Sequence, residues 1–120
     1  MTLRSIDSPR RRPAPTSIAL DDGQTFTLTP GMVVVAVKSN CDGCRSYVDR
    51  PQFSGWSVVP LALDNEIAHA GNVLVSSALV AALEIRSAPF FVAVDGTPLE
   101  IVNEGVPFDL SHLKEILSSR

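Results

Sequence analysis

The feature that most constrains the fold is an apolar stretch that ends at a pair of cysteines. Residues 32–47 read MVVVAVKSNCDGCRSY, and Cys41 and Cys44 are the only cysteines of the chain. The run from Met32 to Val37 is short, largely β-branched and apolar at every position, which predicts a strand buried on both faces of a sheet. Polar residues follow, so we expect Cys41 at or near the N-terminus of a helix, with Cys44 one turn further.

This spacing places the two sulfur atoms on one side of the first helical turn, close enough to bridge. The outer sulfur, of Cys41, would be activated by free N–H groups and the helix dipole, and the inner sulfur, of Cys44, would be shielded. Lys38 and Arg45 favour a Cys41 thiolate while Asp42 disfavours it, so the direction of the net pKa shift stays open. A lone pair at this separation is not the framework that staples small secreted folds, which indicates a chemical role.

Length and composition favour one domain with a leader. The chain has 120 residues, of which 45% are apolar, enough for one core. Residues 1–16 combine three prolines with four arginines, so we predict a flexible leader there and a folded domain at 17–120. The net charge is −3 and the domain itself is acidic, which is not typical of nucleic-acid binding.

The chain contains no run near the roughly 18 apolar residues of a membrane span. Its N-terminal part has basic residues without the apolar segment of a secretion signal. The sequence as given therefore predicts a soluble, cytoplasmic protein, or an extracytoplasmic one if a signal or anchor segment precedes it.

Periodicity and turn residues predict the remaining elements. Before the central strand we expect a hairpin of residues 17–20 and 25–28, and after the cysteines a helix that Pro51 ends, with Phe53 and Trp56 in a loop. The further elements are a strand at 57–63 with Pro60 at a bulge or where no N–H is needed, a loop at 64–72, a helix at 76–83, a strand at 90–94, a type I′-like turn at Asp95-Gly96, and a strand at 99–103 that Pro98 marks as an edge. The tail, residues 109–120, predicts a helix capped by Asp109 or Ser111. Helical crossovers imply parallel central strands.

A buried strand that leads into C-x-x-C, a later strand preceded by Ala88-Pro89, and a D-G hairpin before a terminal helix resemble the thioredoxin-like superfamily. The opening LDDGQTFTL resembles its TlpA/ResA-type and AhpC/TSA-related branches. The resemblance implies an α/β fold, a three-layer α/β/α sandwich with a mixed sheet and an N-terminal β-hairpin. It also implies that Cys41 is the nucleophile, that Cys44 resolves the mixed disulfide, and that Pro89 is cis and faces them.

From this resemblance we expect a thiol-disulfide oxidoreductase that needs no cofactor and no metal. Ala88, Pro89, Asp42 and Gly43 are the expected substrate contacts. The partners would be a protein or small-molecule thiol or disulfide and a redox partner that recycles the cysteines. The chain departs from thioredoxins at three places: Asn40 precedes the first cysteine, Val35 replaces a buried acid, and Asp42-Gly43 replaces Gly-Pro.

Two alternatives to redox chemistry were weighed. The same fold can serve as a redox-inert interaction module, and this alternative stays open. A zinc site formed by the cysteines with His69 and His112 is disfavoured, since the two histidines lie far apart in the sequence instead of in the H-x₃₋₅-H spacing of zinc fingers.

Overall fold

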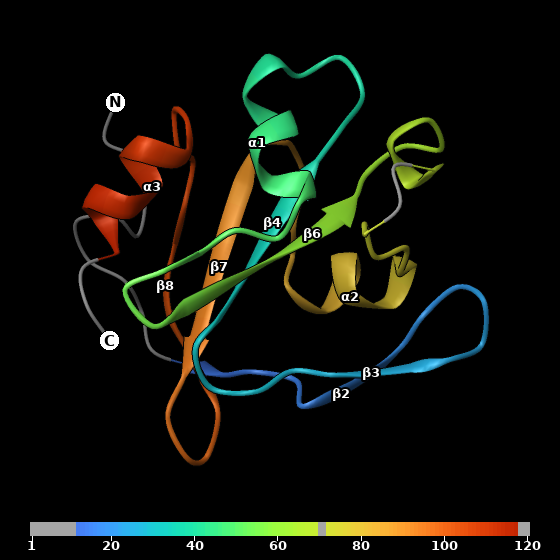
Figure 1. Ribbon diagram of the computed structural model, residues 1–120. Helices are drawn as coiled ribbons and strands as arrows, with labels where there is room; N and C mark the ends of the chain where they lie inside the picture. The colour runs from blue at the N-terminus through green and yellow to red at the C-terminus, as the bar shows by residue number, and fades with distance from the viewer. Residues whose placement is uncertain (1–11, 70–71, 118–120) are drawn as a thin grey trace.

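The fold is built on a mixed sheet with six strands in the order β1-β8-β7-β4-β6-β5 (Figure 1). The computed structural model describes residues 12–69 and 72–117. The strands of this sheet are β1 Arg12–Pro13, β4 Met32–Val37, β5 Gln52–Phe53, β6 Trp56–Ala62, β7 Phe90–Asp95 and β8 Glu100–Gly105. The predicted N-terminal hairpin forms a separate small sheet of β2 Ser17–Ala19 and β3 Thr25–Thr27.

Helices cover both faces of the sheet, which confirms the predicted three layers. One face packs against α2 (Ser77–Ala82) and the β2–β3 hairpin, and the other against α1 (Arg45–Val48) and α3 (Leu110–Ile116). Residues of β4 alternate between the two resulting cores, as a doubly covered strand requires, and Val33 to Val37 have no exposed surface. Two short 3₁₀ helices follow strands of the sheet: η1 (Asp42–Cys44) comes after β4, and η2 (Ile67–His69) comes after β6.

The direction of β7 differs from the prediction. β4 and β6 are parallel, but β7 runs antiparallel to β4. Parallel strands require a helix that carries the chain back along the whole sheet, whereas the six residues of α2 span only about 9 Å. That length is roughly half of a six-residue strand, at about 3.3 Å per residue, so the helix and its flanking loops return the chain to the end of the sheet where β6 finishes.

The residues predicted as a loop after α1 form a strand pair instead. Phe53 pairs with Trp56, and Ser54 and Gly55 between them both have positive φ angles, 51° and 87°. Two consecutive positive φ angles are the hallmark of the tight hairpin turn whose twist suits antiparallel strands. Trp56 is consequently buried, with 6% of its surface exposed.

Pro60 lies inside β6 at a position where the missing N–H is not needed, as predicted. The N–H groups of Ser57 and Leu63 donate toward β4, to Gly31 and Val37. Residues of even number in β6 face the opposite way, so Pro60 directs its ring nitrogen away from β4. The central sheet therefore keeps its ladder of hydrogen bonds.

The β7–β8 connection is longer than the predicted two-residue turn. Asp95 still pairs with Glu100, but residues 96–99 form the loop, with Gly96 at a φ of 90° and a cis Thr97–Pro98 bond. The prediction that Pro98 marks an edge strand is wrong, because β8 lies between β7 and β1.

The predicted leader ends earlier than residue 16. Arg12 and Pro13 form β1, which pairs antiparallel with Ile101 and Glu100 of β8, and Leu28 N–H donates to the Thr16 carbonyl (2.8 Å). The Pro- and Arg-rich composition predicts a solvated segment. Strand pairing with β8 and an ion pair between Arg12 and Glu104 instead attach residues 12–16 to the domain. The rest of the predicted leader, residues 1–11, lies outside the described residues.

Side-chain caps begin the two longer helices where the sequence predicts them. Ser76 Oγ accepts a hydrogen bond from Leu79 N–H (3.0 Å) at the start of α2, and Asp109 Oδ1 accepts one from His112 N–H (2.8 Å) at the start of α3. Among the described helices, none combines the length and apolar character needed to cross a membrane.

Candidate active site

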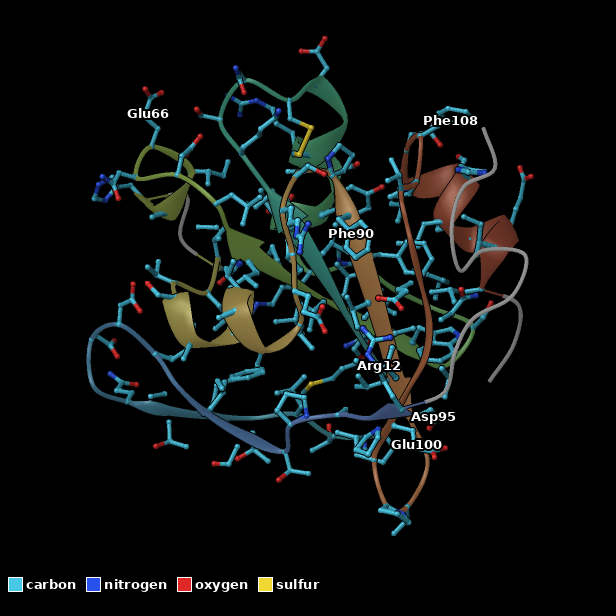
Figure 2. The ribbon with its side chains drawn as sticks, turned by 180° about the vertical axis from the view of Figure 1, so that it is seen from behind. Arg12, Glu66, Phe90, Asp95, Glu100 and Phe108 are labelled. Carbon is cyan, nitrogen blue, oxygen red and sulfur yellow. A yellow bond between two sulfur atoms is a disulfide. The ribbon has the colours of Figure 1, made fainter. Side chains whose placement is uncertain are left out.

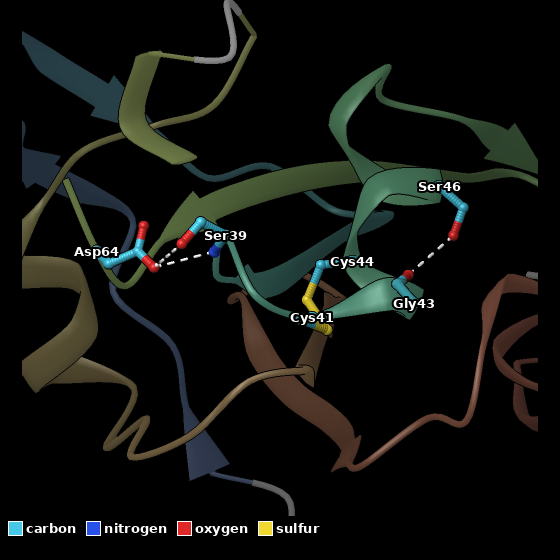
Figure 3. Close-up of a disulfide and its surroundings, with 6 residues drawn as sticks. All are labelled: Ser39, Cys41, Gly43, Cys44, Ser46 and Asp64. Carbon is cyan, nitrogen blue, oxygen red and sulfur yellow. Dashed lines mark hydrogen bonds between the residues drawn. A yellow bond between two sulfur atoms is a disulfide. The ribbon is translucent and has the colours of Figure 1, made fainter. Parts of the chain in front are cut away.

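The two cysteines lie directly after the central strand, where the chain leaves the sheet. Cys41 has extended backbone angles (φ −120°, ψ 111°) and is the N-cap of η1, which continues into α1. Cys44 N–H donates to the Cys41 carbonyl at 3.2 Å. The resulting turn brings the two Cα atoms to 5.3 Å, and the sulfur atoms form a disulfide (Figure 3). The predicted pairing is thus present.

The two sulfur-bearing residues differ in exposure. Cys44 has no exposed surface and packs in the core between the sheet and the α1–α3 layer, whereas Cys41 is partly exposed at its border. The helix behind them is short, since α1 has four residues.

A carboxylate anchors the segment that carries Cys41. Asp64 Oδ2 accepts hydrogen bonds from the backbone N–H (2.9 Å) and the hydroxyl (2.8 Å) of Ser39 (Figure 3). Asp64 Oδ1 accepts one from Ile67 N–H (2.9 Å). These bonds, that of Ile67 first and those of Ser39 next, lower the pKa of Asp64. Asp64 therefore ties the loop before Cys41 to the loop after β6. The sequence analysis did not identify this residue.

Gly43 lies where another part of the backbone comes close. A Cβ atom at Gly43 would lie 3.1 Å from the carbonyl oxygen of Phe108, so a side chain here would push against the loop between β8 and α3. The Ser46 hydroxyl donates to the Gly43 carbonyl at 3.0 Å. Gly43, a predicted substrate contact, thus also lies against the backbone of Phe108. Asp42 beside it is exposed.

Ala88 and Pro89 lie in the segment that leads into β7. The peptide bond between them is cis. Ala88 packs against both cores, including the one that Cys41 borders. Figure 2 shows Phe90, the first residue of β7, at the same end of the sheet as the disulfide. The fold thus brings the Ala88–Pro89 segment to the end of the sheet that carries the cysteines.

Tyr47 is a residue of this region that the sequence analysis left without a function. It has no exposed surface and packs in the same core as Cys44, and its hydroxyl has no hydrogen-bond partner among the described residues. Burial, with a smaller effect of the Asp109 charge, raises the pKa of Tyr47 to about 12. The sequence does not predict this hydroxyl as unpaired, since the core around Tyr47 is assembled from residues far apart in the chain.

The disfavoured zinc arrangement is not formed by the described residues. His69 lies in η2, whereas His112 lies in α3 and accepts the Phe108 N–H at its Nδ1 atom (2.9 Å). Among residues 12–69 and 72–117, no three His, Cys, Asp or Glu side chains are grouped so that they could hold a metal ion.

A cavity of about 550 Å³ lies beside α2, away from the cysteines, which are not among its lining residues. Its walls include Asp64, which anchors Ser39, and Arg86, which lies shortly before Ala88. Three of its polar side chains already serve the fold, because Asp21 and Ser77 bond to one another and Ser76 caps α2.

Comparisons with known proteins identify the fold. No protein-family model matches the chain, and no curated protein sequence does. Among solved structures, a thiol:disulfide interchange protein from Bacteroides sp. matches with a TM-score of 0.51 at 15% identity, over 77% of this chain and 78% of that one. The thioredoxin domain of a thiol-disulfide oxidoreductase from Bacteroides vulgatus matches with a TM-score of 0.50 at 15% identity, over 78% and 85%. The chain therefore has the thioredoxin-like fold found in thiol-disulfide oxidoreductases, with a disulfide between Cys41 and Cys44.

Proposed function

We propose that this protein is a thiol-disulfide oxidoreductase that exchanges its Cys41–Cys44 disulfide with the thiols or disulfides of substrates. The observation that carries the proposal is the disulfide itself, at the junction of a buried strand and a helix, with one partly exposed and one fully buried cysteine. Exchange needs an accessible sulfur that meets the substrate and a second sulfur in reach that completes the transfer.

In the reducing direction, the Cys41 thiolate attacks one sulfur of a substrate disulfide. A bond forms between Cys41 Sγ and that sulfur, and the other substrate sulfur leaves as a thiolate that takes a proton. Cys44, deprotonated, then attacks Cys41 Sγ and releases the second substrate thiolate. Two electrons have passed from the protein dithiol to the substrate, and the protein holds the disulfide; a redox partner must reduce it before another cycle.

The Ala88–Pro89 segment is the proposed docking site for the substrate backbone. Proline lacks an N–H, and the residue before it can pair with an extended segment by strand addition. Support comes from the position of this segment directly before Phe90, the first residue of β7, which lies at the end of the sheet that carries the disulfide (Figure 2). Asp42 and Gly43 are proposed to border the same contact.

The test is a measurement of exchange with single-cysteine variants. The wild type equilibrated in glutathione buffers should show a reversible loss of two thiols, with a reduction potential in the range of about −270 to −120 mV that redox-active pairs of this kind occupy. Cys44→Ser should accumulate mixed disulfides through Cys41, because the resolving thiol is missing. Cys41→Ser is the matched control and should accumulate far fewer, since its remaining thiol is buried.

A redox-inert interaction module makes the opposite prediction. Its disulfide would have a potential below about −300 mV, as stable structural disulfides do, and Cys44→Ser would trap no substrate. Either result would refute the proposed activity while leaving the fold assignment intact.

A further inference from the structure

Phe108 is an aromatic side chain in solvent. Its exposed fraction is 79%, compared with 37% for Val75 and Val106, the other large apolar side chains that are exposed in the described part of the chain. The core aromatic Phe91, by contrast, has no exposed surface. Phe108 lies in the loop between β8 and α3, one residue before the α3 cap.

The loop holds this exposed residue in a defined place. Phe108 N–H donates to His112 Nδ1 (2.9 Å), and the two rings lie 4.7 Å apart at an interplanar angle of 31°. Asp109 then caps the helix that carries His112. An aromatic ring that is already ordered loses little conformational freedom when a partner covers it. Binding of a partner to the Phe108 ring would therefore cost little conformational entropy.

The backbone of the same residue lies next to the turn that carries the two cysteines. Its carbonyl oxygen is 3.1 Å from the position of a Cβ atom on Gly43, which stands between the two cysteines. Figure 2 shows Phe108 at the end of the molecule where the disulfide lies. The φ angle of Gly43 is not positive, so the backbone conformation does not require a glycine there. What the missing side chain provides is room for the Phe108 loop at the rim of the site.

We propose that Phe108 determines substrate specificity, because its ring packs against an apolar side chain next to the substrate cysteine that exchanges with Cys41. This inference rests on the proposed function and names the substrate class: a protein segment with an apolar residue beside its cysteine, in preference to a small thiol such as glutathione. The chemistry of exchange indicates why a substrate segment would contact Phe108. The substrate sulfur must meet Cys41 Sγ, and an extended chain advances about 3.3 Å per residue, so neighbouring side chains reach the adjoining loop.

The test compares disulfide substrates for wild type and Phe108→Ala. The probes are two peptide disulfides that differ only in Leu or Ser next to the cysteine, and oxidised glutathione. We expect the variant to lose roughly tenfold in kcat/KM with the Leu peptide, mainly through KM, because the contact is made equally in ground and transition states. With the Ser peptide and glutathione it should match the wild type.

Two further variants control for folding and for exposed apolar surface in general. Phe108→Tyr keeps the ring and should retain the preference for the Leu peptide, while Val75→Ala removes an exposed apolar side chain that borders the α2 cavity and should change nothing. An equal loss with all three substrates, or no loss with the Leu peptide, would overturn the role of Phe108. Failure of the wild type to exchange with any disulfide would overturn the proposed function and this inference together.

Discussion

At the scale of single residues, Tyr47 combines full burial with a hydroxyl that has no partner among the described residues. A buried donor without a partner forfeits its hydrogen bonds to water, at a cost of about 1–3 kcal/mol. We expect Tyr47→Phe, which keeps the ring, to raise the free energy of unfolding at neutral pH by about 1 kcal/mol. Urea denaturation followed by Trp fluorescence measures this, and a lower stability of the variant would show that the hydroxyl is satisfied.

The same residue predicts a decline of stability at alkaline pH. The folded pKa of Tyr47, about 12, is higher than that of an unfolded tyrosine, about 10. Stability is therefore unaffected by this group below the unfolded pKa, where the phenol is neutral in both states, and it falls as the pH rises from the unfolded to the folded value, because the unfolded phenol ionises first. Tyr47 is the only tyrosine, so absorbance at the tyrosinate band reports it alone. Tyr47→Phe should lack this component of the alkaline decline.

At the scale of elements, the ion pair of Arg12 and Glu104 holds edge strand β1 on β8. Arg12 donates through both terminal nitrogens to the two carboxylate oxygens, at 2.6 and 3.0 Å. The Glu104 side chain is 3% exposed, and the hydrogen bonds and charge of Glu104 raise the pKa of Arg12 although burial opposes this. Two parallel hydrogen bonds fix the orientation of the pair as well as its distance.

Removing the guanidinium should therefore be costly. We expect Arg12→Ala to lower the free energy of unfolding by about 3 kcal/mol, because a buried charge loses its main partner. In the double variant Arg12→Ala/Glu104→Gln part of the stability should return, since the buried charge is gone as well. Arg86→Ala, at an exposed arginine, is the control and should change stability by no more than about 0.5 kcal/mol. Equal effects of the two arginine variants in urea denaturation would contradict this role.

At the scale of the whole molecule, the disulfide closes a very short loop. The two cysteines are three positions apart, so the chain-entropy estimate of its contribution to stability is only about 2 kcal/mol. Two cores hold the sheet and helices together, and Cys44 is one of many buried residues in one of them. We expect the reduced protein to stay folded and to lose about that amount in urea denaturation with a reductant. Unfolding on reduction would instead indicate a structural disulfide.

Much of the fold and of the redox pair could be predicted from the sequence because the relevant interactions are local. The apolar run of β4, the Ser76 and Asp109 caps and the C-x-x-C spacing each act over a few residues, and the structure shows each of them. The tight turn before Trp56 is also local, but a Ser-Gly pair is a weaker signal for positive φ angles than Asn-Gly, so the sequence predicts only a loop there.

Tertiary structure alone decided what depends on residues far apart in the chain. The path of the loops around α2 sets the direction of β7, and Arg12 meets Glu104 across 92 positions. Likewise, Phe108 comes against Gly43, and Tyr47 is buried in a core assembled from several elements, so the rim of the site follows from the packing of residues far apart in the chain. Local propensity determines which residues form a strand, a cap or a disulfide, whereas burial and charge pairing, which need the assembled chain, determine what surrounds them.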